Sequence, residues 1–92
     1  MRKAKEGGIG LNYLIKTLHI LKTELSASDL WRQSPFRHKG SHQALIRSLL
    51  KSHYIIRRSE KRHFRNKTPN VFYSLTFDGE RFLEFLERMK NP

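Results

Sequence analysis

Apolar residues recur at helical spacing in four stretches of the chain. In the first stretch, Asn12 is a suitable N-cap, and five apolar residues follow on one stripe: Leu14, Ile15, Leu18, Leu21 and Leu25. Lys16 and Lys22 lie off this stripe, so the segment has one apolar and one polar side. The pattern predicts a first helix over residues 12–25.

A second, shorter helix is predicted directly after the first. Ser26 and Asp29 have the spacing of a capping box, in which the serine accepts a backbone hydrogen bond and the acid reaches back. The helix covers residues 27–33 and buries Leu30 and Trp31. It ends before Pro35, because the residue that precedes a proline is disfavoured in helical geometry.

The third stretch predicts an amphipathic helix over residues 41–52, with Ser41 as its cap. One side is apolar and is formed by Leu45, Ile46, Leu49 and Leu50, with His42 in the same arc. The opposite side is small, polar and basic, and consists of Gln43, Ala44, Arg47, Ser48 and Lys51. The connector before it, residues 36–40, is also basic.

Two strand-like runs and a last helix complete the pattern. Residues 54–57 and 70–76 are rich in aromatic and β-branched side chains, which predicts a pair of strands. The loop between them has about twelve residues, five of them Lys or Arg. Loops of that length without structure of their own are uncommon and often functional. Thr76 is the expected cap of a final helix, striped by Phe82, Phe85, Leu86 and Met89.

The elements predict one small α+β domain that is mostly α. It covers residues 11–92 and follows a flexible, glycine-containing basic arm at residues 1–10. The chain of 92 residues has no cysteine, which excludes disulfides, thiolate metal sites and cysteine nucleophiles. No apolar run approaches the roughly 20 residues that span a bilayer. We expect no catalytic site, no cofactor and no membrane segment.

Positive charge is concentrated in the middle of the chain. Residues 32–67 contain eleven Lys or Arg and one acid, Glu60, and so carry +10 of the formal net charge of +11. The same block contains the amphipathic third helix and a strand, which favours a folded basic surface over a disordered tail. A folded surface of this kind is typical of proteins that bind nucleic acid.

The order of helix, short helix, amphipathic helix, strand, basic loop, strand and helix resembles that of winged helix-turn-helix regulators. The resemblance is sharpest at Leu49-Leu-Lys-Ser-His-Tyr-Ile-Ile-Arg-Arg58 and at Tyr73-Ser-Leu-Thr-Phe-Asp-Gly79. It is similar to the pattern of MarR- and PadR-type regulators and of small archaeal DNA-binding proteins. His53 departs from that pattern, because a glycine usually stands there at a positive φ that His can also adopt.

The resemblance implies a three-helix core, a two-stranded β-wing and a C-terminal helix. It also implies that the third helix enters the major groove of double-stranded DNA, where Gln43 and Arg47 would read bases beside Ala44. Phosphate contacts are expected from Ser41 and Lys51 on that helix and from Arg37 and Lys39 before it. The wing would add further DNA contacts from Arg58, Lys61, Arg62, Arg65 and Lys67.

Several residues admit two interpretations. His42 has the position of a recognition residue, but its place in the apolar arc favours packing or capping. Trp31 is interpreted as a core residue. Phe64 at the wing tip would either insert between bases or fold back on the strands. His38 and His42 have a spacing that zinc proteins use, but without cysteine or a metalloprotease motif we expect no metal.

The sequence therefore predicts a cytoplasmic, nucleoid-associated transcription regulator. It would act as a homodimer through its first and last helices, because two half-sites double the DNA contacts. No segment identifies a small-molecule effector. The alternatives are a nonspecific architectural DNA- or RNA-binding protein and a winged-helix module that docks on another protein.

Overall fold

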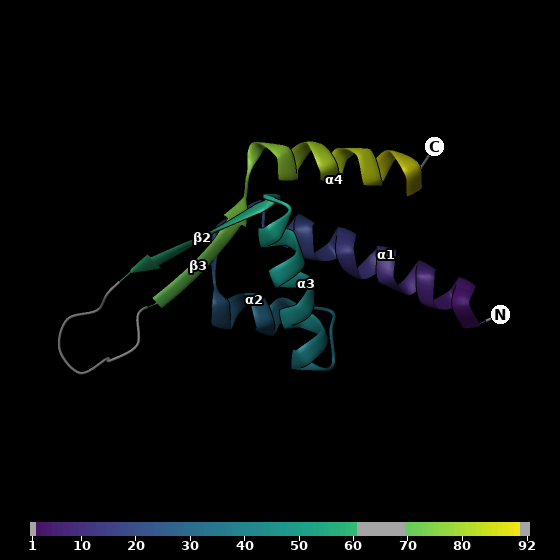
Figure 1. Ribbon diagram of the computed structural model, residues 1–92, viewed down its shortest axis with the longest axis horizontal. Coiled ribbons are helices and arrows are strands. Elements are labelled where there is room, and N and C mark those ends of the chain that lie inside the picture. The colour runs from purple at the N-terminus through teal and green to yellow at the C-terminus, as the bar shows by residue number, and fades with distance from the viewer. Residues whose placement is uncertain (1, 61–69, 91–92) are drawn as a thin grey trace.

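The computed structural model describes residues 2–60 and 70–90, with side chains from residue 10 onward. In chain order these residues form α1 (Arg2–Ile20), β1 (Leu25–Ser26), α2 (Ala27–Gln33), α3 (Lys39–Lys51), β2 (Ile55–Glu60), β3 (Asn70–Leu75) and α4 (Phe77–Lys90) (Figure 1). The described part of the chain is thus α+β and mostly helical, as predicted.

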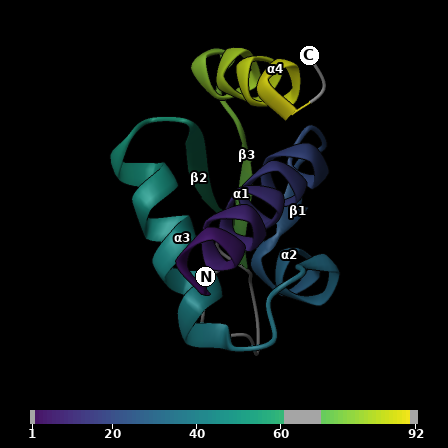
Figure 2. The same cartoon turned by 90° about the vertical axis from the view of Figure 1, so that its right-hand side faces the viewer.

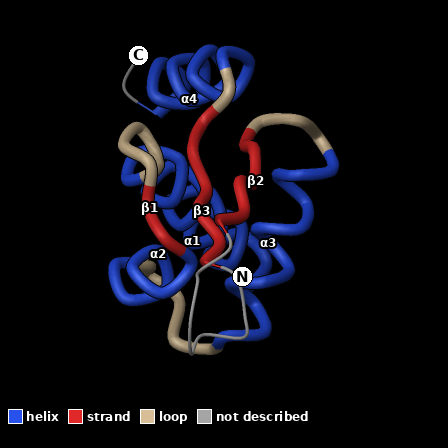
Figure 3. Tube along the Cα trace, turned by 90° about the vertical axis from the view of Figure 1, so that its left-hand side faces the viewer, coloured by secondary structure: helices blue, strands red, loops and turns tan. Residues whose placement is uncertain are grey.

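The three strands form one antiparallel sheet in the order β1-β3-β2 (Figure 3). Leu25 pairs with Tyr73 on one side of β3, and Ile55 pairs with Leu75 on the other. The β2–β3 hairpin is described as far as the pair Glu60 and Asn70. It projects away from the helices in Figure 1.

The core lies where the helices meet the base of the hairpin. Figure 2 looks along α1. In this view α4 lies above α1, and α3 and α2 lie to either side below α4. Eight apolar residues from the four helices, the turn after α1 and β2 are at most 5% exposed: Leu18, Leu21, Leu30, Ile46, Leu49, Ile55, Leu83 and Leu86. Seven of them lie on the apolar stripes or runs that the sequence analysis identified; Leu83 adds a position on the last helix.

The first helix begins earlier than predicted. α1 starts at Arg2, whereas the sequence suggested a cap at Asn12 and a flexible arm before it. The prediction of an arm was therefore wrong for the secondary structure of residues 2–10. The segment contains no proline, and its Arg, Lys, Ala and Glu residues favour helix enough to accommodate glycines that cost about 1 kcal/mol each.

The first helix also ends earlier than predicted, and a short strand follows it. α1 stops at Ile20, and β1 occupies the position where the helix was expected to continue to Leu25. The N–H of Leu75 donates to the Leu21 carbonyl over 3.2 Å, which joins this turn to β3. A two-residue strand has no periodic pattern of its own, so only its pairing with β3 identifies it.

The second helix has the predicted start. The N–H of Asp29 donates to Oγ of Ser26 over 3.1 Å, which confirms Ser26 as the N-cap. The carboxylate of Asp29 forms an ion pair with Arg32 over 3.2 Å, on the solvent side of the helix. Ser26 thus accepts the backbone hydrogen bond expected of a capping box. The Asp29 carboxylate pairs with Arg32, further along the helix, where the capping box would have it reach back toward Ser26.

The third helix begins two residues before the predicted cap. Its N-cap is His38, whose backbone is extended and whose side chain makes no capping hydrogen bond. Ser41 therefore lies in the first turn and does not cap the helix. The exposed Gly40 has open space around it and fits the helical turn without a packing penalty.

Two junctions attach the hairpin to the helices. His53 has φ of 64°, as predicted from its place at the end of the third helix. Thr76 Oγ1 donates to the His53 carbonyl over 2.7 Å and accepts from the Gly79 N–H over 2.9 Å, so Thr76 caps α4 as predicted. A Cβ atom at Gly79 would overlap the Tyr54 carbonyl oxygen. The Tyr73–Gly79 motif is therefore explained by how α4 packs on the hairpin.

Candidate nucleic-acid interface

The outer face of α3 is polar and basic, and its inner face is buried. His42, Ile46 and Leu49 are each at most 5% exposed. The outer face consists of exposed residues, among them all the α3 residues predicted to contact DNA: Lys39, Ser41, Gln43, Ala44, Arg47 and Lys51. The helix lies at one side of the molecule (Figures 2 and 3). Its outer face is therefore open to a large partner.

Three polar side chains form a row along this face. Gln43, Arg47 and Lys51 follow each other at intervals of four residues, which places them one above the other on a helix. The row extends about 12 Å along the axis, close to the length of three to four base pairs. The row therefore has the length needed to face consecutive base pairs.

The cations of α3 face solvent without an acidic neighbour. The 13 residues of this helix include no Asp or Glu. Among the side chains that the structure describes, residues 10–60 and 70–90, the ion pairs involve His19, Arg32 and Arg58, and none involves Lys39, Arg47 or Lys51. Arg37, in the turn before α3, is also exposed and outside these pairs. These cations can meet a phosphate without first leaving a carboxylate.

Arg58 differs from the cations of α3. Its Nε and Nη2 donate to the two carboxylate oxygens of Glu24 over 3.0 and 2.9 Å, and its Nη1 donates to Glu60 over 2.7 Å. The guanidinium also lies 4.6 Å from the centre of the Phe72 ring. The hydrogen bond with Arg58 lowers the pKa of Glu24, and both carboxylates raise the pKa of Arg58.

This network changes the interpretation of Arg58 as a DNA-contacting residue. Its charge is balanced by two acids of the same chain, and it ties β2 to the turn after α1. Glu24 is 34 residues away, so no spacing in the sequence indicated the pair. A contact between Arg58 and DNA stays a prediction, and such a contact would have to compete with Glu24 and Glu60.

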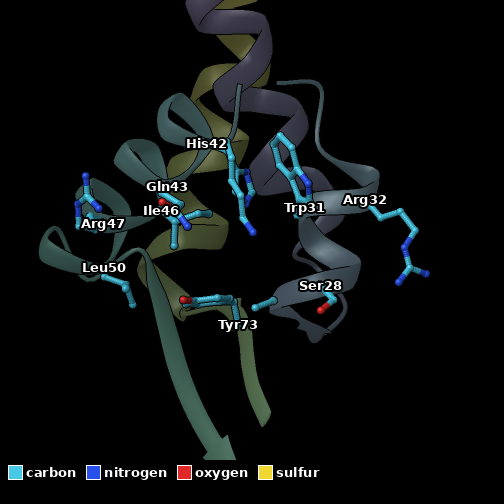
Figure 4. A pocket seen from close by; sticks show the side chains of 11 residues that line it. Ser28, Trp31, Arg32, His42, Gln43, Ile46, Arg47, Leu50 and Tyr73 are labelled. Atoms are coloured by element: carbon cyan, nitrogen blue, oxygen red, sulfur yellow. The ribbon is translucent and has the colours of Figure 1, made fainter. Parts of the chain in front are cut away.

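A pocket of about 610 Å³ opens between α2 and α3 (Figure 4). No pattern in the sequence predicted this pocket. Trp31, interpreted as a core residue, is only partly buried and forms one wall. His42 and Ile46 form the facing wall, and Tyr73 of β3 lies across the base. A pocket formed by three elements has no signal in a local pattern, because its lining comes together only when α2, α3 and β3 pack.

His42 is packed within this wall, as its place in the apolar arc predicted. Its ring lies 5.1 Å from that of Trp31 and 6.1 Å from that of Phe36, measured between centres. Burial, and then the charge of Lys39, lowers the pKa of His42 below 6.5. Its Nδ1 is buried without a hydrogen-bond partner among the described residues. Neutral His42 thus supports the position of α3 on α2.

The last helix has a different surface. Its outer side combines acids with three exposed apolar residues, Phe77, Phe85 and Met89, which are 71%, 55% and 56% exposed. Glu87 lies 3.6 Å from His19 of α1, so α1 and α4 are neighbours at this side. The predicted homodimer surface therefore does include exposed apolar area.

The remaining predicted wing contacts, Lys61, Arg62, Arg65 and Lys67, and also Phe64, lie outside the described residues. The described residues contain no group of three or more potential metal ligands. In the same part of the chain, no helix is long and apolar enough to cross a membrane. Comparison of the chain with family models, with curated proteins and with solved structures gave no match.

Proposed function

We propose that the chain is a winged helix-turn-helix DNA-binding regulator, in which α2 and α3 form the helix-turn-helix and β2 and β3 form the wing. The observation that carries the proposal is the outer face of α3, where Gln43, Arg47 and Lys51 stand in one exposed row with no acid on the helix. An α-helix fits the major groove of B-DNA, and side chains of these types read its base edges.

Each residue of the row has a role that follows from its chemistry. Gln43 pairs with adenine, and Arg47 pairs with guanine through two hydrogen bonds. Lys51, at the far end of the helix, contacts phosphate as a point charge. Lys39 and Arg37 contact phosphate at the near end. The cluster supplies both the affinity that depends on salt and the smaller contribution that depends on sequence.

We further propose a homodimer through α1 and α4. The exposed Phe77, Phe85 and Met89 support this assignment, since their burial in an interface would be favourable. The acids of α4 make this helix a poor surface for DNA, which leaves it free for a second copy. Two copies related by a two-fold axis would place two α3 helices on two half-sites.

The proposal is tested by selection from a random duplex library. We expect a consensus that contains adenine and guanine at the positions facing Gln43 and Arg47, repeated as an inverted half-site. Arg47→Ala should relax one position of the consensus. The matched control is Lys22→Ala in the turn after α1, which removes one exposed positive charge outside α3 and the proposed dimer helices and should leave the consensus unchanged.

The other outcomes distinguish the alternatives. Enrichment of all sequences alike would indicate a nonspecific architectural protein. A strong preference for RNA over duplex DNA would indicate an RNA-binding protein. An absence of nucleic-acid binding at moderate salt would contradict the proposal and favour a module that docks on another protein.

A further inference from the structure

The pocket between α2 and α3 is lined by aromatic rings from three elements. Trp31 comes from α2, His42 from α3 and Tyr73 from β3, and Ile46 completes the apolar surface. Figure 4 shows the Tyr73 ring edge-on at the base, so one of its faces is turned toward the space between the helices. Aromatic faces of this kind stack on nucleobases of any sequence, because every base has a π-face.

Cations lie at the rim of this aromatic surface, and Arg47 and Arg32 extend outward from it on opposite sides (Figure 4). Lys39 and Arg47 of α3 and Arg32 of α2 line the same pocket. Lys39 and Arg47 take part in no ion pair of the described residues, and Arg32 pairs only with the half-buried Asp29. A purely apolar ligand would gain nothing from three cations. The lining therefore suits a flat ring that carries a negative charge nearby.

The buried Nδ1 of His42 adds a polar requirement. Buried polar atoms in folded proteins generally have a partner, and an atom without one calls for an explanation. The edge of a nucleobase carries both donors and acceptors, so it can serve either tautomer of a neutral imidazole. His42 lines the pocket, whose volume of about 610 Å³ is typical of small-molecule sites.

We propose that this pocket binds an unpaired nucleotide, with its base stacked on Tyr73 and Trp31 and its phosphate on Lys39. A base within a duplex cannot enter, because its faces are covered by its neighbours. The nucleotide is either free in solution or an unpaired nucleotide of a DNA strand. The second source rests on the proposed DNA-binding function, and the first does not.

The single tryptophan of the chain makes the test direct. Trp31 lines the pocket, so a base that stacks there should quench its fluorescence. The full chain is titrated with nucleoside monophosphates, with the corresponding nucleosides and with inorganic phosphate. We expect saturable quenching by the monophosphates, weaker binding of the nucleosides and no quenching by phosphate alone.

Two variants separate the base from the phosphate. Tyr73→Leu should lower the affinity for monophosphates and nucleosides alike by about 5-fold to about 150-fold, the range for loss of one base–aromatic stack. Phe77→Leu on α4 is the matched control and should change neither. Lys39→Ala should reduce the advantage of monophosphate over nucleoside, and this result stays informative if Tyr73→Leu fails to fold.

A second titration identifies the source of the nucleotide. The protein is compared on a perfect duplex and on the same duplex with one extrahelical nucleotide. Tighter binding and stronger quenching with the extrahelical nucleotide would support a strand-borne ligand. Quenching by free monophosphates, with equal affinity for both duplexes, would support a free nucleotide.

The failures are distinguishable. If duplexes bind but no nucleotide or extrahelical base quenches Trp31, the pocket proposal is overturned and the proposed function stands. Quenching by inorganic phosphate equal to that by monophosphates would also overturn it, since only an anion would then bind. If monophosphates quench but no duplex binds, the pocket is supported and the DNA-binding proposal fails.

Discussion

The outer face of α3 and the base of the β2–β3 hairpin are both basic in sequence, yet their cations have different surroundings. Arg47 and Lys51 on α3 have no acidic partner in the described structure. Arg58 on β2 is bonded to Glu24 and Glu60 at the same time. In the net charge of the chain these three side chains count equally.

The difference shows that a charge count overestimates the cations that are available to a polyanion. A free surface cation approaches a phosphate and displaces only water and counterions. A guanidinium already held by a carboxylate exchanges one charged partner for another, and the exchange leaves two acids near the nucleic acid. The outer face of α3 should therefore contribute more to binding than the base of the hairpin.

The largest expected effect concerns Arg47 against Arg58. Arg47→Ala should weaken binding to the selected duplex by about 1–3 kcal/mol, the usual contribution of a bidentate base contact. Arg58→Ala should weaken binding less, since Glu24 and Glu60 already balance the positive charge of this guanidinium. Fluorescence anisotropy with labelled duplex measures both. Equal losses in the two variants would remove the distinction between the regions.

A smaller effect is expected when Arg58 is released. Glu24→Gln removes the carboxylate that accepts two hydrogen bonds from Arg58, so the affinity for duplex should rise. The slope of log K against log salt concentration should also become steeper, by up to the amount that one additional phosphate contact gives, about one unit. Glu84→Gln on α4 is the control for a change in net charge. A rise of the same size in both variants would mean that Arg58 gains no contact.

A pH effect should reveal how α3 is held. The pKa of His42 is lower in the folded chain than its ordinary value of 6.5. As the pH falls below 6.5, the imidazole of His42 therefore takes up a proton in the unfolded chain before it does so in the folded chain. Stability linked to His42 should therefore be complete above that pH and decrease as the pH falls toward the lower pKa of the folded state. Urea unfolding between about pH 8 and about pH 5 measures the slope, and His42→Gln should reduce it. An unchanged slope would contradict a buried, neutral His42.

The smallest expected effect lies at the start of the hairpin. His53 adopts φ of 64°, a conformation that glycine accepts without the steric cost of a Cβ atom. His53→Gly should stabilise the fold by up to about 1 kcal/mol, because glycine adopts this conformation without steric cost. The greater backbone entropy that glycine loses on folding should offset part of this gain. Thermal unfolding measures it, with His38→Gly as a control outside the left-handed region. A loss of stability at position 53 would show that the His53 side chain itself stabilises this junction.

Local patterns in the sequence predicted the elements that depend on near neighbours. The two faces of α3 and the Thr76 cap follow from residues within a few positions of each other. The positive φ of His53 was expected from the resemblance to winged helix-turn-helix regulators, which usually have glycine there. The start of α1 was missed because Gly7, Gly8 and Gly10 indicated an arm, although the Arg, Lys, Ala and Glu residues beside them favour a helix. β1 was missed because two residues cannot show a period.

The candidate site divides in the same way. The row of Gln43, Arg47 and Lys51 was predictable from one helix. The pocket was not, because Trp31, His42 and Tyr73 meet only after α2, α3 and β3 have packed. The pair of Arg58 with Glu24 likewise depends on a contact between residues 34 positions apart.

The close approach of Gly79 to the Tyr54 carbonyl has a consequence for the gene. The first two bases of a glycine codon specify the amino acid, so a single-base change at either of them would place a Cβ atom or a larger group against that oxygen. Asp78 and Glu80 on either side are exposed and should accept many replacements. In a library of random coding variants, position 79 should stand out as a codon in which mainly silent third-base changes survive.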